Sequence, residues 1–393
     1  MARPTRQQLE QLKQQLGDVF WRLNNLYSIV DKDGRKVPFR LSPAQDHLCR
    51  HMHFLNVVLK ARQLGFSTFI DIFMLDACLF NPNVQAGVIA HTKDDAQEIF
   101  RTKIKFPYDN LPEGLKREIP IVRDNATALE LRNGSSIRVG TSLRSGTLQY
   151  LHVSEYGKLC ARFPEKAREV RTGALNTVQA GQIAFIESTA EGQEGHFFEL
   201  CQKAQENARR KIKLGKLDWR FHFYPWWLQD EYRLDPADVE ISDEYRRYFD
   251  KLEAELAKDE ADVWLRPLKV MRPVKITADQ RAWYVKKAFT QLDDMKREYP
   301  STPQEAFEAV LEGAYYATQL AAAEMEGRIG RYRAIDGVAV HTAWDIGRKD
   351  YTSIWFFQTL PGRIRVVGFY RASADCSPCR CENYGKYAET GTG

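Results

Sequence analysis

The chain has 393 residues, with 57 Lys and Arg against 52 Asp and Glu, a net charge of +5, 44% hydrophobic residues and 28% charged residues. This balance excludes a disordered or fibrous protein, and the length predicts two domains, or three pieces. The mean hydropathy is −0.48, and no apolar run reaches about 18 residues, so we expect no membrane span. We also expect no signal peptide, and the unpaired cysteine spacings favour a reducing compartment.

An amphipathic helix is predicted near the N-terminus. Leu9, Leu12 and Leu16 follow one another at spacings of three and four, which places them on one helix face. We assign residues 1–37 to an N-terminal helical arm and expect its helix to dock on the main domain. The alternative is an arm that binds a partner.

Residues 38–202 alternate short apolar runs with helical stretches. We predict helices over residues 68–80 and 92–105, and strands over residues 54–59, 85–90, 136–139, 150–153 and 183–188. Apolar strands that alternate with helices predict a parallel sheet with helices on both faces. In such sheets ligands bind beyond the carboxyl ends of the strands.

The second half of the chain differs from the first in its charge distribution and in its pattern of predicted elements. Residues 203–220 hold seven basic and two acidic residues, whereas residues 230–262 hold thirteen acidic and five basic residues. This switch predicts an accessory subdomain or linker over residues 203–305. A further αβ unit is predicted over residues 306–370, with strands at 338–344, 352–358 and 364–370, the last two joined as a hairpin by a Pro-Gly turn.

A phosphate-binding loop is the strongest motif. The segment LKARQLGFST, residues 59–68, follows a predicted strand and opens a predicted helix. Such a loop uses backbone N–H groups at a helix N-terminus, a glycine, a cation and a hydroxyl for Mg²⁺. Gly65 supplies the glycine, while Ser67 and Thr68 supply hydroxyls. Lys60 and Arg62 are the candidate cations, and the alternative is an ordinary strand-to-helix turn.

Two further strands end in polar side chains. The strand over residues 150–153 runs into Ser154 and Glu155. A glutamate in that place can activate a water molecule as a general base, and a serine hydroxyl can hold a metal-bound water. The strand over residues 183–188 ends in Ser188 and Thr189, followed by Gly192, which is typical of a segment that senses a phosphate and relays hydrolysis to a moving part.

Together these motifs resemble the large subunit of the tailed-phage terminase, the ATP-driven motor that packages DNA. The resemblance covers roughly residues 38–370 and implies an additional-strand (ASCE-type) P-loop NTPase with ATP and Mg²⁺ as cofactors. Lys60 then replaces the lysine that usually stands at position 66, which is Phe66 here. By the same resemblance, the implied roles are adenine reading by Gln45, phosphate binding by Lys60, Arg62, Gly65, Ser67 and Thr68, metal binding by Ser67 and Ser154, catalysis by Glu155 and Arg62, and coupling by Ser188, Thr189 and Gly192.

The resemblance also implies partners and a second activity. The expected partners are double-stranded DNA, a terminase small subunit, the portal protein of the procapsid and further copies of the chain in a ring, in the cytoplasm of a bacterial host and without a membrane. The family's C-terminal domain is an RNase H-like nuclease that uses Mg²⁺ or Mn²⁺. Asp345 matches its first metal-binding carboxylate and Asp350 is a candidate auxiliary ligand, but Arg371 occupies the next acidic position. We therefore expect an incomplete, inactive nuclease domain, with residues 371–393 as an aberrant tail of a truncated gene.

Two other functions remain open from the sequence. A helicase-like or repair P-loop ATPase would share the core sheet, but it would carry an Asp-Glu pair at positions 154–155 and a second motor domain. An inactive prophage remnant would carry the same motifs without activity. ATP hydrolysis stimulated by DNA separates the motor and the helicase-like ATPase from the remnant.

Overall fold

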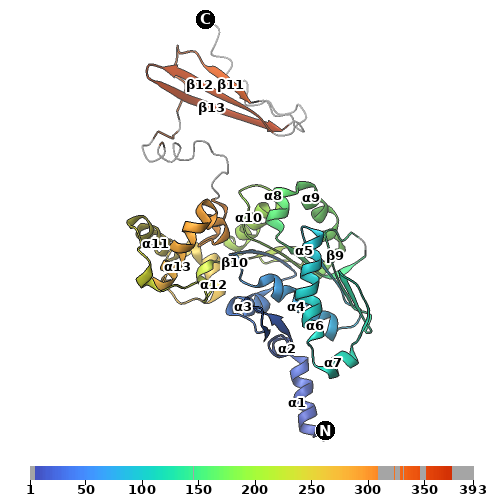
Figure 1. Ribbon diagram of the computed structural model, residues 1–393. Coiled ribbons are helices and arrows are strands. Elements are labelled where there is room, and N and C mark those ends of the chain that lie inside the picture. The colour runs from blue at the N-terminus through green and yellow to red at the C-terminus, as the bar shows by residue number, and fades with distance from the viewer. Residues whose placement is uncertain are drawn as a thin grey trace. The chain divides into compact units, whose positions relative to one another are not determined.

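A computed structural model describes residues 5–144, 146–308, 323, 328–330, 332–345 and 351–373. The chain folds as two compact units, unit 1 over Met1–Gly313 and unit 2 over Ala314–Gly393 (Figure 1). Within the described residues, no helix combines the length and the apolar character that crossing a membrane requires.

Unit 1 is built on an eight-stranded sheet in the order β10-β3-β9-β8-β4-β7-β6-β5. The first six strands in this order are mutually parallel, and β6 and β5 continue the sheet as an antiparallel edge. This mixed α/β sheet confirms the predicted fold class. The strands are β3 Leu55–Lys60, β4 Gln85–Ile89, β5 Ile121–Asp124, β6 Ala128–Leu131, β7 Ser136–Gly140, β8 Leu148–Ser154, β9 Val178–Ser188 and β10 Trp219–Tyr224.

Helices flank this sheet (Figure 1). They are α3 Pro43–His51, α4 Phe66–Phe80, α5 Lys93–Ile99, α6 Phe106–Asp109, α7 Glu113–Glu118, α8 Tyr156–Arg162, α9 Pro164–Thr172 and α10 His196–Arg209. The single helix predicted over residues 92–105 is α-helical only to Ile99 and continues as a π-helix, η1 Phe100–Lys105. Short π-helical segments occur frequently at functional sites.

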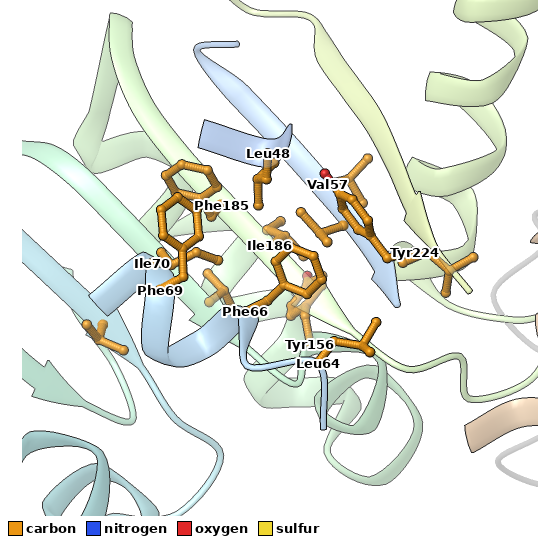
Figure 2. Packing of buried hydrophobic residues seen from close by; sticks show 14 of the residues in the cluster. Leu48, Val57, Leu64, Phe66, Phe69, Ile70, Tyr156, Phe185, Ile186 and Tyr224 are labelled. Atoms are coloured by element: carbon orange, nitrogen blue, oxygen red, sulfur yellow. The ribbon is translucent and has the colours of Figure 1, made fainter. Parts of the chain in front are cut away.

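The core lies between β3, β9 and α4. The side chains of Val57, Val58 and Leu59 in β3 are fully buried, as a parallel strand covered on both faces requires. Phe69 and Phe185 pack from α4 and β9 into the same cluster (Figure 2). This packing fixes the loop between β3 and α4 against the sheet edge.

The N-terminal arm contains α1 Arg6–Gly17, α2 Val19–Asn25 and a small hairpin, β1 Ser28–Val30 with β2 Lys36–Pro38. Helix α1 begins at a capping box but buries none of its residues, so the expected docking of this helix is wrong. The arm is held by α2 instead, since Arg22 makes a buried ion pair of 2.7 Å with Asp76 of α4.

The sheet extends past the predicted core boundary at residue 202, because β10 pairs with β3. The rest of the accessory segment is helical: α11 Asp243–Leu256, α12 Asp262–Leu268, α13 Ala278–Gln291, α14 Met295–Glu298 and α15 Pro303–Phe307, with short 3-10 turns at Trp226–Leu228, Pro236–Asp238, Asp259–Ala261 and Leu292–Asp294. A capping box of Thr277 and Gln280 opens α13.

Unit 2 contains a three-stranded antiparallel sheet in the order β11-β12-β13. The strands are β11 His341–Asp345, β12 Tyr351–Leu360 and β13 Arg363–Ser373, and the predicted hairpin with its turn at residues 361–362 is confirmed. Large apolar side chains of this sheet are exposed, among them Trp344 and Phe369.

Candidate nucleotide site

The predicted site residues of unit 1 gather at the carboxyl edge of the parallel sheet. In the strand register, Glu187 of β9 lies level with Val58 of β3 on one side and with Ser154 of β8 on the other. The ends of β3, β8 and β9 therefore lie side by side, with Lys60 at the end of the first strand. This is the edge at which α/β sheets bind their ligands.

The glycine of the loop adopts a backbone that other residues avoid. Gly65 has a φ of +73° and precedes the first residue of α4, whose free N–H groups favour anions. A Cβ at this position would lie 2.7 Å from Nε2 of Gln45. That amide nitrogen donates to the Gly65 carbonyl at 2.9 Å, while the amide oxygen of Gln45 accepts from the backbone N–H of Ser42. Gln45 thus clamps the loop, and its reading of adenine stays a prediction.

Phe66 stands where a P-loop would usually carry its lysine, and it is buried in the core. Its side chain is 1% exposed, and its ring lies 4.3 Å from that of Tyr224 on β10 (Figure 2). A lysine at position 66 would place its ammonium in this apolar cluster. The position is therefore suited to packing and unsuited to phosphate binding.

Lys60 is a buried cation shared by two carboxylates. Its Nζ lies 3.1 Å from Oε1 of Glu155 and 3.0 Å from Oε2 of Glu187. Burial by itself lowers the pKa of Lys60, but the two carboxylates outweigh it and raise the pKa above its usual value. Lys60 is therefore charged at neutral pH, and its role as a phosphate cation stays a prediction.

Glu187 is the residue of the site that sequence reasoning missed. It is fully buried, and its Oε1 accepts hydrogen bonds from the hydroxyls of Ser67 at 2.6 Å and Ser154 at 3.0 Å. Burial tends to raise the pKa of Glu187, but Lys60 and His152 hold it well below its usual value. A charged carboxylate therefore lies directly behind the predicted magnesium hydroxyl.

His152 and Asp71 support that carboxylate from the other side. Nε2 of His152 lies 3.5 Å from Oε1 of Glu187, and Nδ1 lies 2.7 Å from Oδ1 of Asp71. Burial lowers the pKa of His152, but Asp71 and Glu187 together raise it to about 9. The imidazole is thus a cation at neutral pH, fixed between two buried carboxylates.

Glu155 lies where β8 turns into α8. Its φ is +51°, a left-handed conformation that is uncommon for a residue with a side chain and that concentrates at functional sites. The carboxylate contacts Lys60 and lies 3.7 Å from Nζ of Lys158, and its side chain is 25% exposed. Of the two carboxylates that pair with Lys60, Glu155 reaches the solvent and Glu187 does not.

The segment after β9 carries two buried hydroxyls. Ser188 and Thr189 are 0% and 1% exposed, and neither hydroxyl has a hydrogen-bond partner within the described residues. Gly192 follows with a φ of +84°. Since buried polar groups are nearly always paired, these two hydroxyls are set to accept or donate a hydrogen bond when a ligand or a movement supplies one.

A cavity of about 290 Å³ lies over the loop. Two lysines that the sequence reasoning did not select, Lys103 from η1 and Lys158 from α8, add positive charge to it. Of the two predicted magnesium ligands, Ser67 lines the cavity and Ser154 does not. The lining residues are Lys60, Arg62, Gln63, Leu64, Gly65, Phe66, Ser67, Thr68, Lys103, Glu155, Lys158, Thr189 and Glu298.

Arg62 is tied to the accessory segment. Its guanidinium lies 2.8 Å from a carboxylate oxygen of Glu298 in α14, and its carbonyl accepts from the hydroxyl of Tyr232. The catalytic role expected for Arg62 would require the guanidinium to leave Glu298 for the phosphates. Arg144 pairs with Glu169 at 2.7 Å and lines a different cavity.

The donors at this edge fit a magnesium ion. Mg²⁺ prefers hard oxygen ligands, keeps several waters and uses few protein groups beside the substrate phosphates. Ser67 lines the cavity, and its hydroxyl donates a hydrogen bond to the carboxylate of Glu187. One direct hydroxyl and a nearby charged carboxylate meet these requirements.

The predicted nuclease residues of unit 2 are only partly described. Asp345 ends β11 and is exposed, while Asp350 lies outside the described residues. Asp345 is level with Ser353 of β12, which in turn is level with Arg371 of β13. Within the described residues, no three His, Cys, Asp or Glu side chains are grouped as metal ligands.

The strand order places β9 between the loop strand β3 and the glutamate strand β8, as in the additional-strand P-loop fold that the sequence predicts. Among solved structures, the chain is similar to the large terminase ATPase domain of Thermus phage P74-26, at 16% identity and a TM-score of 0.39 over 77% of this chain and 99% of that one. It is also similar to the large terminase of a thermophilic bacteriophage in complex with ATP-gamma-S, at 11% identity and a TM-score of 0.32, over 81% of this chain and 62% of that one. The Phi-28 gp11 DNA packaging motor matches at 10% identity and a TM-score of 0.29, over 84% of this chain and 78% of that one. No protein-family model matches the chain, and a search of curated proteins finds no relative.

Proposed function

We propose that the chain is the ATP-hydrolysing subunit of a phage terminase, the motor that moves double-stranded DNA into the procapsid. The observation that carries this proposal is Lys60, held between Glu155 and Glu187 beside the loop glycine Gly65. A phosphate-binding cation and a candidate general base thereby share one cavity. The motifs that resemble the terminase family all contribute to this edge of one sheet.

In this proposal Lys60 binds the β- and γ-phosphates, and the N-terminus of α4 binds them through backbone N–H groups. Bound Mg²⁺ would neutralise charge on the phosphate oxygens, with Ser67 as its protein ligand. Because Lys60 is shared with Glu155, phosphates that draw Lys60 toward them weaken its hold on that carboxylate. Glu155 is then free to accept a proton from the attacking water.

Movement would be relayed by two contacts of the same cavity. Thr189 is one of the lining residues, and its buried hydroxyl has no partner among the described residues. Arg62 joins the cavity to Glu298 of the accessory segment. A γ-phosphate that binds Arg62 would compete with Glu298, so the state of the nucleotide would change a contact between the loop and α14. Portal protein, small subunit and further copies of the chain complete the proposed motor.

The deciding experiment is ATP hydrolysis by the purified full chain with and without double-stranded DNA. We expect turnover that DNA stimulates, and we expect Glu155→Gln to lower it about 10²–10⁴-fold while ATP binding is retained, because the glutamate acts on water. Hydrolysis by Glu155→Gln at the parental rate would refute the assignment. Absence of turnover in the parental chain would favour an inactive prophage remnant.

A further inference from the structure

We infer that Glu187 is the positioning residue of the magnesium site, in place of the acidic residue missing from position 154. This inference rests on the proposed ATPase function. P-loop ATPases hold Mg²⁺ through a loop hydroxyl and an acidic residue at the end of a neighbouring strand. Here the hydroxyl is present as Ser67, but the strand β8 ends in Ser154, so the expected carboxylate is absent from its usual strand.

The strand register supplies a carboxylate at the same level. Glu187 lies opposite Ser154 across the β8–β9 pair, so the two positions are adjacent at one edge. Its Oε1 accepts from both serine hydroxyls, at 2.6 Å from Ser67 and 3.0 Å from Ser154. The carboxylate therefore lies on the neighbouring strand β9, at the same level along the sheet as position 154.

The hydrogen bond from Ser67 determines which way its oxygen faces. A serine hydroxyl has one proton and two lone pairs. Because the proton is donated to Glu187, both lone pairs of Ser67 remain available on the side of the hydroxyl away from that carboxylate. Ser67 also lines the cavity over the loop, where a metal ion would accept a lone pair.

Glu187 is itself held in a fixed orientation. Lys60 lies 3.0 Å from one carboxylate oxygen, and His152 lies 3.5 Å from the other. Asp71 fixes His152 in turn, at 2.7 Å. Partners behind a metal ligand orient it, and their loss typically lowers metal affinity by about 10–100-fold. Glu187 is fully buried and does not line the cavity, so it acts through Ser67.

The test measures the dependence of nucleotide binding on Mg²⁺, with the full chain and a fluorescent, slowly hydrolysed ATP analogue. Each variant is titrated in EDTA and again in Mg²⁺. The readout is the dissociation constant in EDTA divided by the dissociation constant in Mg²⁺. For Glu187→Gln we expect this ratio to fall by about 10–100-fold, with the affinity in EDTA retained. A loss of general packing would change both titrations alike.

Two further variants keep the test decisive. Glu187→Asp preserves the charge beside Lys60 but withdraws the carboxylate from Ser67 by about 1.5 Å, one carbon–carbon bond, so it should fold and still lose Mg²⁺ dependence. Glu253→Gln removes a paired carboxylate on α11, far from the loop in sequence, and should behave as the parent. Parental Mg²⁺ dependence in Glu187→Asp overturns the inference. Failure of the parent to bind the analogue even in EDTA refutes the ATPase proposal instead.

Discussion

Replacement of Lys60 by Met separates the stabilising role of this residue from its binding role. The side chains of Lys60 and Glu187 are 6% and 0% exposed, so the variant leaves Glu187 as a buried charge without its closest cation. Removal of one partner from a buried ion pair costs about 3–5 kcal/mol. We expect the free energy of unfolding to fall by that amount in urea denaturation, and binding of a fluorescent ATP analogue to be lost.

The matched control is Phe66→Ala. Deletion of a buried phenylalanine side chain also costs about 3–5 kcal/mol, but Phe66 packs on Tyr224 and carries no charge for a phosphate. The two single variants should therefore lose similar stability, whereas only Lys60→Met should lose nucleotide affinity.

A double variant, Lys60→Met with Glu187→Gln, removes both charges and should regain most of the stability without regaining affinity, because a neutral pair has no unpaired buried charge. Weaker ATP binding in Phe66→Ala than in Lys60→Met would refute the assignment of Lys60 as the phosphate cation.

Three further predictions concern the site and unit 2. Gly65→Ala and Gly34→Ala both place alanine at a positive φ, which costs about 1–2 kcal/mol, but only Gly65→Ala meets Gln45 at 2.7 Å and should lose ATP affinity in the same titration. The pKa of His152 is raised from 6.5 to about 9, so its stabilising contribution is complete below pH 6.5 and disappears as the pH rises through about 9; urea midpoints across this range should fall in the parent and stay flatter in His152→Gln. Unit 2 should not cut plasmid DNA in Mg²⁺ or Mn²⁺, because the third-strand position level with Asp345 holds an arginine; cleavage that Asp345→Ala eliminates would contradict this.

The parallel core could be predicted because its strands are buried on both faces. Such strands read as short apolar runs, and the sequence predicts β3 and β4 to within one residue of their ends for that reason, whereas β9 begins five residues before the predicted start at 183 because most of its first half is not buried. The residues that follow the strands were found because polar side chains after apolar runs are conspicuous. Lys60, Ser67 and Glu155 accordingly lie at one edge, as predicted.

Other elements could not be found from local pattern. Strand β10 carries Arg220 and His222 and follows a basic stretch, so the sequence pattern assigns it to a charged linker. Only its pairing with β3 makes it a strand of the sheet. Strand β5 is mostly exposed at the edge and has little apolar signal. In both, tertiary pairing outweighs the local composition.

Glu187 was missed because the charge of a residue inside an apolar run gives no information about its partners. The sequence nevertheless contained a signal in its spacings. Ser67 and Asp71 are four apart on α4, and His152 and Ser154 are two apart on β8, so each pair shares one face of its element. Only the packing of α4 on the sheet shows that these two faces meet around Glu187.

The two departures from a standard P-loop have one physical explanation. Position 66 carries an aromatic ring that packs in the core, and the proposed phosphate cation is Lys60 on β3. Position 154 carries a hydroxyl, and the proposed carboxylate behind the magnesium site is Glu187 on β9. Parallel strands end at the same edge, so a charge can move to a neighbouring strand and still occupy the same region of space. A search for a motif with fixed spacing along the chain misses such an exchange. The same charges are nevertheless present at the edge of the sheet.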